Sequence, residues 1–99
     1  MVYKIRWTPE AEETYDAVIE YLENHWSDRE IIRFVTKTNE TIDQIVIHPE
    51  LFESSSKKNI RVGLIIPQIS LFYQNSEHDK TILLLSFWDN RQDPRKRKY

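Results

Sequence analysis

Residues 83–99 read LLLSFWDNRQDPRKRKY, an apolar strand that runs into a strongly basic end. The last nine positions hold one acid, Asp93, against five cations. These cations are Arg91, Arg95, Lys96, Arg97 and Lys98. One element therefore joins a predicted core strand to a charged surface, and that surface is suited to an anionic partner.

The charge of the chain is divided between its two parts. Residues 1–56 hold 5 Lys and Arg against 12 Asp and Glu, a net charge of -7, whereas residues 57–99 hold 9 against 4, a net charge of +5. The total is only -2, so one basic face is expected on a mildly acidic molecule. This balance argues against a free nucleic-acid-binding domain, which is usually far more basic.

Length and composition indicate one domain. Ninety-nine residues suffice for a single core. The chain has no cysteine, which excludes disulfides and thiolate metal sites, and its three histidines lack metal-ligand spacing. We expect no metal and no cofactor. No apolar run approaches the roughly 18–20 residues that span a bilayer, so we expect a soluble, cytoplasmic protein without a membrane partner.

A strand and two helices are predicted in the first half. Residues 2–7 alternate between apolar and charged side chains, as a half-buried strand does. Thr8 and Pro9 are typical of a helix start, and the next apolar residues recur at helical spacing. Ser27 and Glu30 have the form of a capping box for a second helix, which Pro49 ends.

The second half predicts three strands. Residues 51–58 form a polar loop without hydrophobic periodicity, and strands are expected at 59–66, 69–74 and 81–88. The predicted fold is a two-layer α+β domain that spans residues 1–99. It consists of an N-terminal strand, an antiparallel helical hairpin and a three-stranded antiparallel meander, with both helices on one face of a four-stranded sheet.

Alternation sorts the strand residues into two faces. We expect the helices to cover Tyr3, Ile5, Trp7, Ile60, Val62, Leu64, Ile66, Ile69, Leu71, Tyr73, Leu83, Leu85 and Phe87. The opposite, open face would then present Lys4, Arg6, Arg61, Gly63, Ile65, Ser70, Phe72, Gln74, Ile82, Leu84, Ser86 and Trp88. Such a mixed cationic and aromatic surface suits a macromolecular partner, and a groove floored by Gly63 would hold either a phosphate and base or a peptide.

Structural interpretations compete with these functional ones. Trp7 and Trp26 are expected in the core, whereas Trp88 suits the core and a binding surface equally. Residues 95–98 also fit a solvated chain end. Arg61 is the cation least explained by solubility, because its predicted position is inside the sheet.

Several motifs along the chain together resemble toxins of the RelE/ParE superfamily. They are Trp7-Thr8-Pro9-Glu10-Ala11 after the first strand, His48-Pro49-Glu50-Leu51-Phe52 after the helical hairpin, Asn59-Ile60-Arg61 opening the next strand and Trp88-Asp89-Asn90-Arg91-Gln92-Asp93-Pro94 after the last. Their order covers essentially the whole chain. The resemblance implies the toxin of a type II toxin-antitoxin module, which arrests growth and is neutralised by a cognate antitoxin.

The resemblance leaves the target and the chemistry open. RelE-like toxins cleave mRNA on the ribosome, whereas ParE-like toxins of the same fold inhibit DNA gyrase. If the chain is an enzyme, it is a metal-independent endoribonuclease. The candidate catalytic residues are then Arg61, Arg91, Lys57, Lys58 and Tyr99, and the candidate binding residues are Arg6, Phe72, Trp88, Arg95, Lys96, Arg97 and Lys98. The alternative is a non-toxic interaction domain that keeps the toxin fold.

Overall fold

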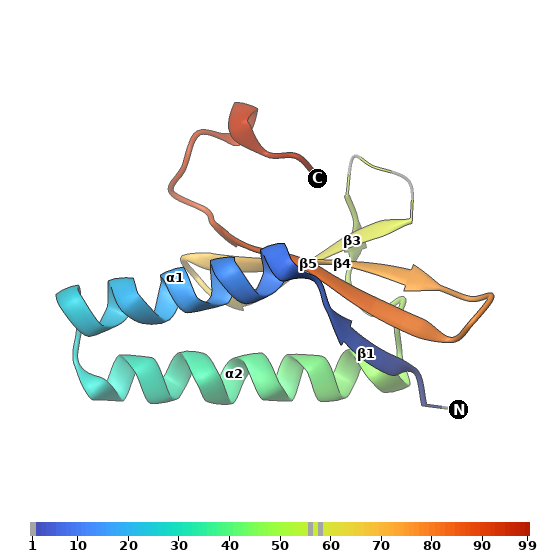
Figure 1. The fold of residues 1–99 in the computed structure, drawn as a ribbon, viewed down its shortest axis with the longest axis horizontal. Coiled ribbons are helices and arrows are strands. Elements are labelled where there is room, and N and C mark those ends of the chain that lie inside the picture. Colours follow the sequence, from blue (N-terminus) through green and yellow to red (C-terminus); the bar gives the residue numbers. More distant parts are fainter. Residues whose placement is uncertain (1, 56, 58) are drawn as a thin grey trace.

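The computed structural model describes residues 2–55, 57 and 59–99. The elements, in chain order, are β1 (Lys4–Trp7), α1 (Pro9–His25), α2 (Asp28–Ile47), β2 (Glu53–Ser54), β3 (Ile60–Ile66), β4 (Ile69–Ser76), β5 (Thr81–Asp89) and a short 3₁₀ helix, η1 (Pro94–Lys96). Figure 1 shows both helices on one side of the sheet and the residues after β5 on the other. The predicted two-layer α+β fold is confirmed.

The sheet has five strands in the order β1-β5-β4-β3-β2. β1 is parallel to β5, and all other pairs are antiparallel, which confirms the meander. The predicted number of four strands is wrong, because β2 pairs with β3 inside the expected polar loop. A strand of two residues has too little alternation to be seen in the sequence.

β1 pairs with residues 81–84 of β5, and α1 lies beside the following residues of that strand. The predicted cap of α1 is confirmed, since the Thr8 hydroxyl accepts from the Ala11 amide at 3.1 Å. The same hydroxyl donates to the Leu84 carbonyl at 2.8 Å, and Thr14 Oγ1 accepts from the Phe87 amide at 2.9 Å. The Thr14 side chain of α1 therefore satisfies a β5 amide that lies beyond the end of β1.

The start of α2 differs from its prediction. Ser27 is the N-cap residue, but its side chain makes no capping hydrogen bond, so the expected capping box is wrong. The end is as predicted, because α2 stops at Ile47 before Pro49.

The core lies between the helices and the sheet. The Phe87 ring stacks on Trp7 at 5.5 Å and meets Tyr15 at 5.2 Å and Phe34 at 6.1 Å between centroids. Trp7 packs against the core, as expected, but Trp26 is 48% exposed, so its predicted core position is wrong.

Two β-bulges change which side chains the helices cover. In β3 the register shifts at Ile65, and in β5 it shifts at Leu85. Residues paired across the ladder share a face, so Arg61 lies beside core Tyr73 and Gly63 beside core Leu71. The core therefore contains Ile65, Ile82 and Leu84, which were predicted on the open face. The open face instead receives Ile60, Val62, Leu64 and Leu83, which were predicted under the helices.

Gly63 leaves room for an aromatic ring on the helix-covered face. A Cβ atom at this position would stand 3.0 Å from two atoms of the Phe52 ring. Phe52 in turn meets the Tyr73 ring edge-on at 6.5 Å and packs against the core. The predicted groove floored by Gly63 on the open face is therefore wrong.

Within the described residues, neither helix is long and apolar enough to cross a membrane.

Candidate functional site

The segment after β5, residues 90–99, forms an arch over the open face of the sheet, and we call it the tail. Figure 1 shows it rising from the end of β5, turning at η1 and returning toward the sheet. Asp93 shapes the turn, because its carboxylate accepts from the Arg95 amide at 3.0 Å. The carboxylate also pairs with the Arg95 guanidinium at 2.8 Å.

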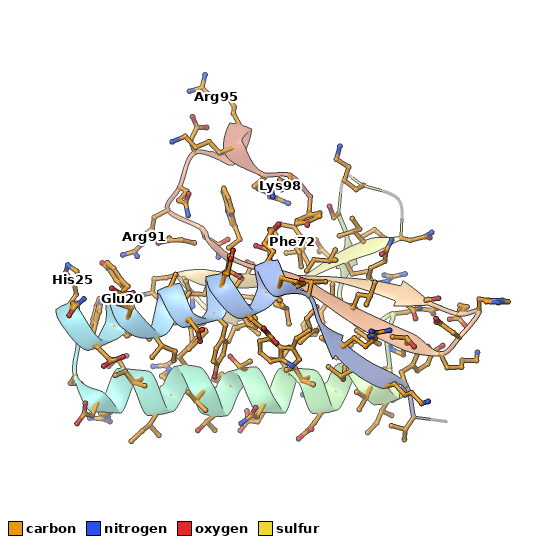
Figure 2. All side chains as sticks on the ribbon, in the orientation of Figure 1. Glu20, His25, Phe72, Arg91, Arg95 and Lys98 are labelled. Atoms are coloured by element: carbon orange, nitrogen blue, oxygen red, sulfur yellow. The ribbon has the colours of Figure 1, made fainter. Side chains whose placement is uncertain are left out.

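The end of the tail contacts both the sheet and α1. The ring centroids of Tyr99 and Phe72 are 5.7 Å apart. The Arg97 guanidinium lies over Phe72, with its Cζ 4.7 Å from the ring centroid. Lys98 Nζ donates to Glu10 Oε1 at 2.8 Å. Figure 2 shows Lys98 on the returning part of the tail, whereas Arg95 stands at the outer end of the arch. Phe72 is consequently 1% exposed, although no helix covers its face.

The contacts that hold the tail are individually weak. The Lys98 side chain is 70% exposed, and ion pairs this open to water contribute little to stability. An aromatic pair such as Tyr99 and Phe72 contributes about 0.5–1.5 kcal/mol beyond its buried area. Residues 97–99 are thus held over the sheet by contacts that each contribute little.

A hollow of about 320 Å³ lies between the arch and the sheet. Five residues that the sequence predicted for the site line it together: Phe72, Trp88, Lys96, Lys98 and Tyr99. The structure therefore gathers aromatic rings and ammonium groups into one place, which suits a partner with planar and charged groups.

The docked position raises the pKa of both Lys98 and Tyr99. Burial raises the pKa of Tyr99, and the nearby Glu10 carboxylate raises this pKa further. The hydrogen bond to Glu10 raises the pKa of Lys98. Both shifts favour a neutral phenol and a charged ammonium in the docked tail.

Arg91 is clamped near the start of the tail. Its guanidinium donates to both carboxylate oxygens of Asp89, at 3.0 and 2.8 Å, and to the Tyr21 hydroxyl at 3.2 Å. Tyr21 also stacks on His25 at 4.4 Å. The hydrogen bond from Arg91 lowers the pKa of Asp89, and the pKa of Arg91 is raised in return. Arg91 is therefore neutralised within the chain.

A second pocket, of about 220 Å³, opens beside this clamp. Apolar residues such as Val18, Leu22 and Ile69 form much of its lining, while Trp26 and Arg91 also border it. It lies where the helical hairpin separates from the far end of the sheet. Its apolar lining suits an aliphatic or aromatic side chain.

Arg61 lies away from the tail. Its Nη1 donates to the Phe52 carbonyl at 2.8 Å, and among the described residues it forms no ion pair. Neighbouring residues of a strand point to opposite faces, so Arg61, which is paired with Tyr73, lies across the sheet from Phe72 and Tyr99. Its predicted place on the open face is therefore wrong, and it ties the segment after α2 to β3.

The remaining predicted residues are dispersed. Lys57 is exposed in the β2–β3 loop, and Lys58 lies outside the described residues. Arg6 is exposed on β1, where it pairs with Leu83 on the open face.

Three residues of the site were missing from the prediction. Glu10 bonds Lys98, 88 positions further along the chain, and Tyr21 bonds Arg91, 70 positions further along. Local sequence patterns cannot predict contacts between residues so far apart in the chain. Asp89 stands two positions before Arg91, and this short spacing of opposite charges could have indicated the clamp. Among the described residues, no group of three or more His, Asp or Glu side chains converges as metal ligands would.

The fold is that of bacterial toxins. The RelBE2 toxin-antitoxin complex of Mycobacterium tuberculosis matches with a TM-score of 0.63 at 13% identity, over 91% of this chain and 100% of that one. The chromosomal ParDE system of P. aeruginosa matches with a TM-score of 0.70 at 16% identity, over 89% and 96%. The YoeB dimer of Staphylococcus aureus matches with a TM-score of 0.59 at 20% identity, over 87% and 94%.

The sequence defines the family within this fold. The family model described as the ParE toxin of the type II toxin-antitoxin system, parDE, matches residues 5–94. The chain therefore belongs to the ParE toxin family. No curated protein matches the sequence significantly.

Proposed function

We propose that this chain arrests growth by binding DNA gyrase, and that a cognate antitoxin neutralises it. Its membership of the ParE toxin family supports the toxin role. Gyrase inhibition is the activity that the ParE-like branch of the superfamily implies, and it requires binding alone.

The placement of the candidate catalytic residues is the observation that carries the choice of target. Metal-free RNA cleavage needs a base, an acid and cations around one phosphate, within hydrogen-bond reach. Arg61 and Tyr99 lie on opposite faces of the sheet, and Arg91 is already paired with Asp89. This dispersal favours a binding toxin over a nuclease.

The same comparisons support an antitoxin as partner. The similar structures from M. tuberculosis and P. aeruginosa are described as a toxin-antitoxin complex and a toxin-antitoxin system. A partner of this chain has two candidate surfaces, the apolar pocket at the hairpin end and the face beneath the tail. We propose that the antitoxin covers at least the second of these.

A growth assay tests whether the chain is a toxin. Expression alone should arrest growth, and co-expression of the neighbouring reading frame should restore it. Harmless expression of the folded chain would instead support a non-toxic interaction domain.

Two biochemical assays then test the target. Purified chain should inhibit DNA supercoiling by gyrase and should leave mRNA intact in toeprinting on ribosomes. Cleavage of ribosome-bound mRNA with unchanged supercoiling would replace gyrase with the ribosome as target.

A tryptophan pair provides a matched control for the gyrase assay. Trp88 lines the hollow under the tail, whereas Trp26 borders the pocket at the other site. Trp88→Ala should weaken gyrase inhibition at least tenfold, as expected of an aromatic hot spot worth roughly 1.4 kcal/mol or more, and Trp26→Ala should change it by less than about twofold. An equal loss of gyrase inhibition in both variants would mean that the open face is not the gyrase-binding surface.

A further inference from the structure

Among the residues that the structure describes, the tail is what covers the apolar centre of the open face. Phe72 is 1% exposed, and the ring of Tyr99 lies against it. Tyr99 belongs to no strand or helix and is linked to β5 by residues 90–98 of the tail. Leu64 on the same face remains 57% exposed. The open face therefore has the apolar character of a docking surface, and the tail shows the chemistry that it accepts.

The charge next to this face is complementary to the tail. α1 contains six acids and neither lysine nor arginine. Glu10, in its first turn, binds Lys98, and Glu13 also raises the pKa of that ammonium. A segment that places an aromatic ring on Phe72 and a cation beside Glu10 would make the contacts that the tail makes now.

Residues 97–99 are the part of the tail that a partner segment can replace on the sheet. The first residue of the tail, Asn90, is fixed to the sheet, because the Asn90 side chain accepts from the Ser70 hydroxyl at 3.0 Å. Arg95 at the top of the arch, in contrast, has 91% of its side chain exposed. Residues 97–99 are held by one aromatic pair, one cation above a ring and one exposed ion pair. A partner with a larger interface can displace them.

We infer that the Phe72 face is a docking surface for a protein segment carrying an aromatic side chain beside a cation, and that residues 97–99 occupy it in the free chain. The identification of this partner as the antitoxin rests on the proposed function, whereas the surface and its intramolecular occupant do not. A docked tail hides the surface, so the apparent affinity is the intrinsic affinity multiplied by the fraction of molecules in which the tail is released.

The inference predicts opposite effects from tail and surface substitutions. Lys98→Ser with Tyr99→Ala releases the tail and should tighten binding of the purified product of the neighbouring reading frame, about tenfold if the tail is docked in nine molecules of ten. Lys37→Ser removes an exposed lysine of α2, on the helix-covered side of the sheet, and should leave the affinity unchanged. In the released background, Glu10→Gln should weaken binding at least threefold, and it adds no bulk that would disturb the fold.

Isothermal titration calorimetry measures all four affinities on the full chain. Weaker or unchanged binding by the released variant would overturn the inference, because the tail would then be a partner contact or irrelevant to the surface. Unchanged affinity after Glu10→Gln would show that the partner places no cation beside Glu10, and the proposed partner chemistry would be wrong.

A second measurement separates the surface from the proposed function. If the neighbouring product binds no variant, the antitoxin assignment fails, and the surface is tested with a peptide of residues 93–99 (DPRKRKY) at millimolar concentration. The amide resonances of Phe72 and Trp88 should shift in the released variant and stay in place in the wild-type chain, where the linked tail competes. Equal shifts in both chains, or none in the released variant, would overturn the inference.

Discussion

The two faces of the sheet bury their central aromatic residues to a similar degree by different means. Phe87, on the helix-covered face, is 4% exposed and is held by Trp7, Tyr15 and Phe34 from β1, α1 and α2. Phe72, on the open face, is 1% exposed beneath Arg97 and Tyr99. Burial alone therefore does not distinguish a permanent core from a surface that its own chain covers reversibly.

The strongest test of this difference removes each ring in turn. Phe87→Ala should lower the free energy of unfolding by about 3–5 kcal/mol, because the surrounding rings cannot close the cavity. Phe72→Ala should cost less than about half as much, because the tail can leave the site. Urea denaturation followed by circular dichroism measures both. Equal losses would show that the tail is as fixed as the helices.

Gly63 tests the packing of the helix-covered face. Gly63→Ala should destabilise the chain by about 1–3 kcal/mol, since the new methyl group meets the Phe52 ring at 3.0 Å. In a double-mutant cycle, Phe52→Leu should reduce this cost by creating space, so the two substitutions should cost less together than their sum. Additive costs in urea denaturation would mean that the two side chains do not compete for space.

Arg61 tests whether a cation of the predicted site is structural. Arg61→Met removes the hydrogen bond to the Phe52 carbonyl and should lower the free energy of unfolding by roughly 1–2 kcal/mol. Gyrase inhibition, measured well below the unfolding temperature, should then be retained. If Arg61→Met abolished gyrase inhibition without lowering the free energy of unfolding, Arg61 would be a functional residue and not a structural one.

Alkaline pH should release the tail without unfolding the core. The docked tail has a raised Tyr99 pKa and a raised Lys98 pKa, so its stabilisation is complete below the ordinary tyrosine value of about 10 and is lost as pH rises through the docked values. The groups that face Tyr99 and Lys98 are Glu10 and Glu13 from α1, and Arg97 lies nearby over Phe72.

Ring-proton shifts of Phe72 across a pH titration report this release. Tyr99→Phe keeps the ring and removes its titration, so it should move the release to higher pH. An identical titration of Phe72 in the Tyr99→Phe chain would contradict the prediction.

The sequence predicted those parts of the fold that local patterns determine. Thr8 and Pro9 locate the start of α1, and Pro49 the end of α2, because each acts on its own backbone. The phase of β3 could not be read in this way. Ile60, Val62 and Leu64 alternate with Arg61 and Gly63, so alternation indicated the wrong side as buried. Phe52 fills the space at Gly63 on the covered face, and the bulges at Ile65 and Leu85 shift the pairing.

The sequence indicated which side chains lie near the tail but not how they are arranged. Phe72, Trp88 and the tail cations were correctly grouped on the open face, because the order of the elements brings the end of the chain there. Arg61 was assigned to the same face through the wrong phase of β3. The tie between Glu10 and Lys98 depends on the tertiary fold, since nothing in either local sequence indicates its partner.

The most direct test of the difference between the faces is one NMR experiment on two samples. Nuclear Overhauser effects between the ring protons of Phe72 and Tyr99, and between those of Trp7 and Phe87, are measured in the free chain and in its complex with the antitoxin. We predict both sets in the free chain and only the Trp7–Phe87 set in the complex. Absence of the Phe72–Tyr99 effects from the free chain, or their persistence in the complex, would contradict the exchangeable cover.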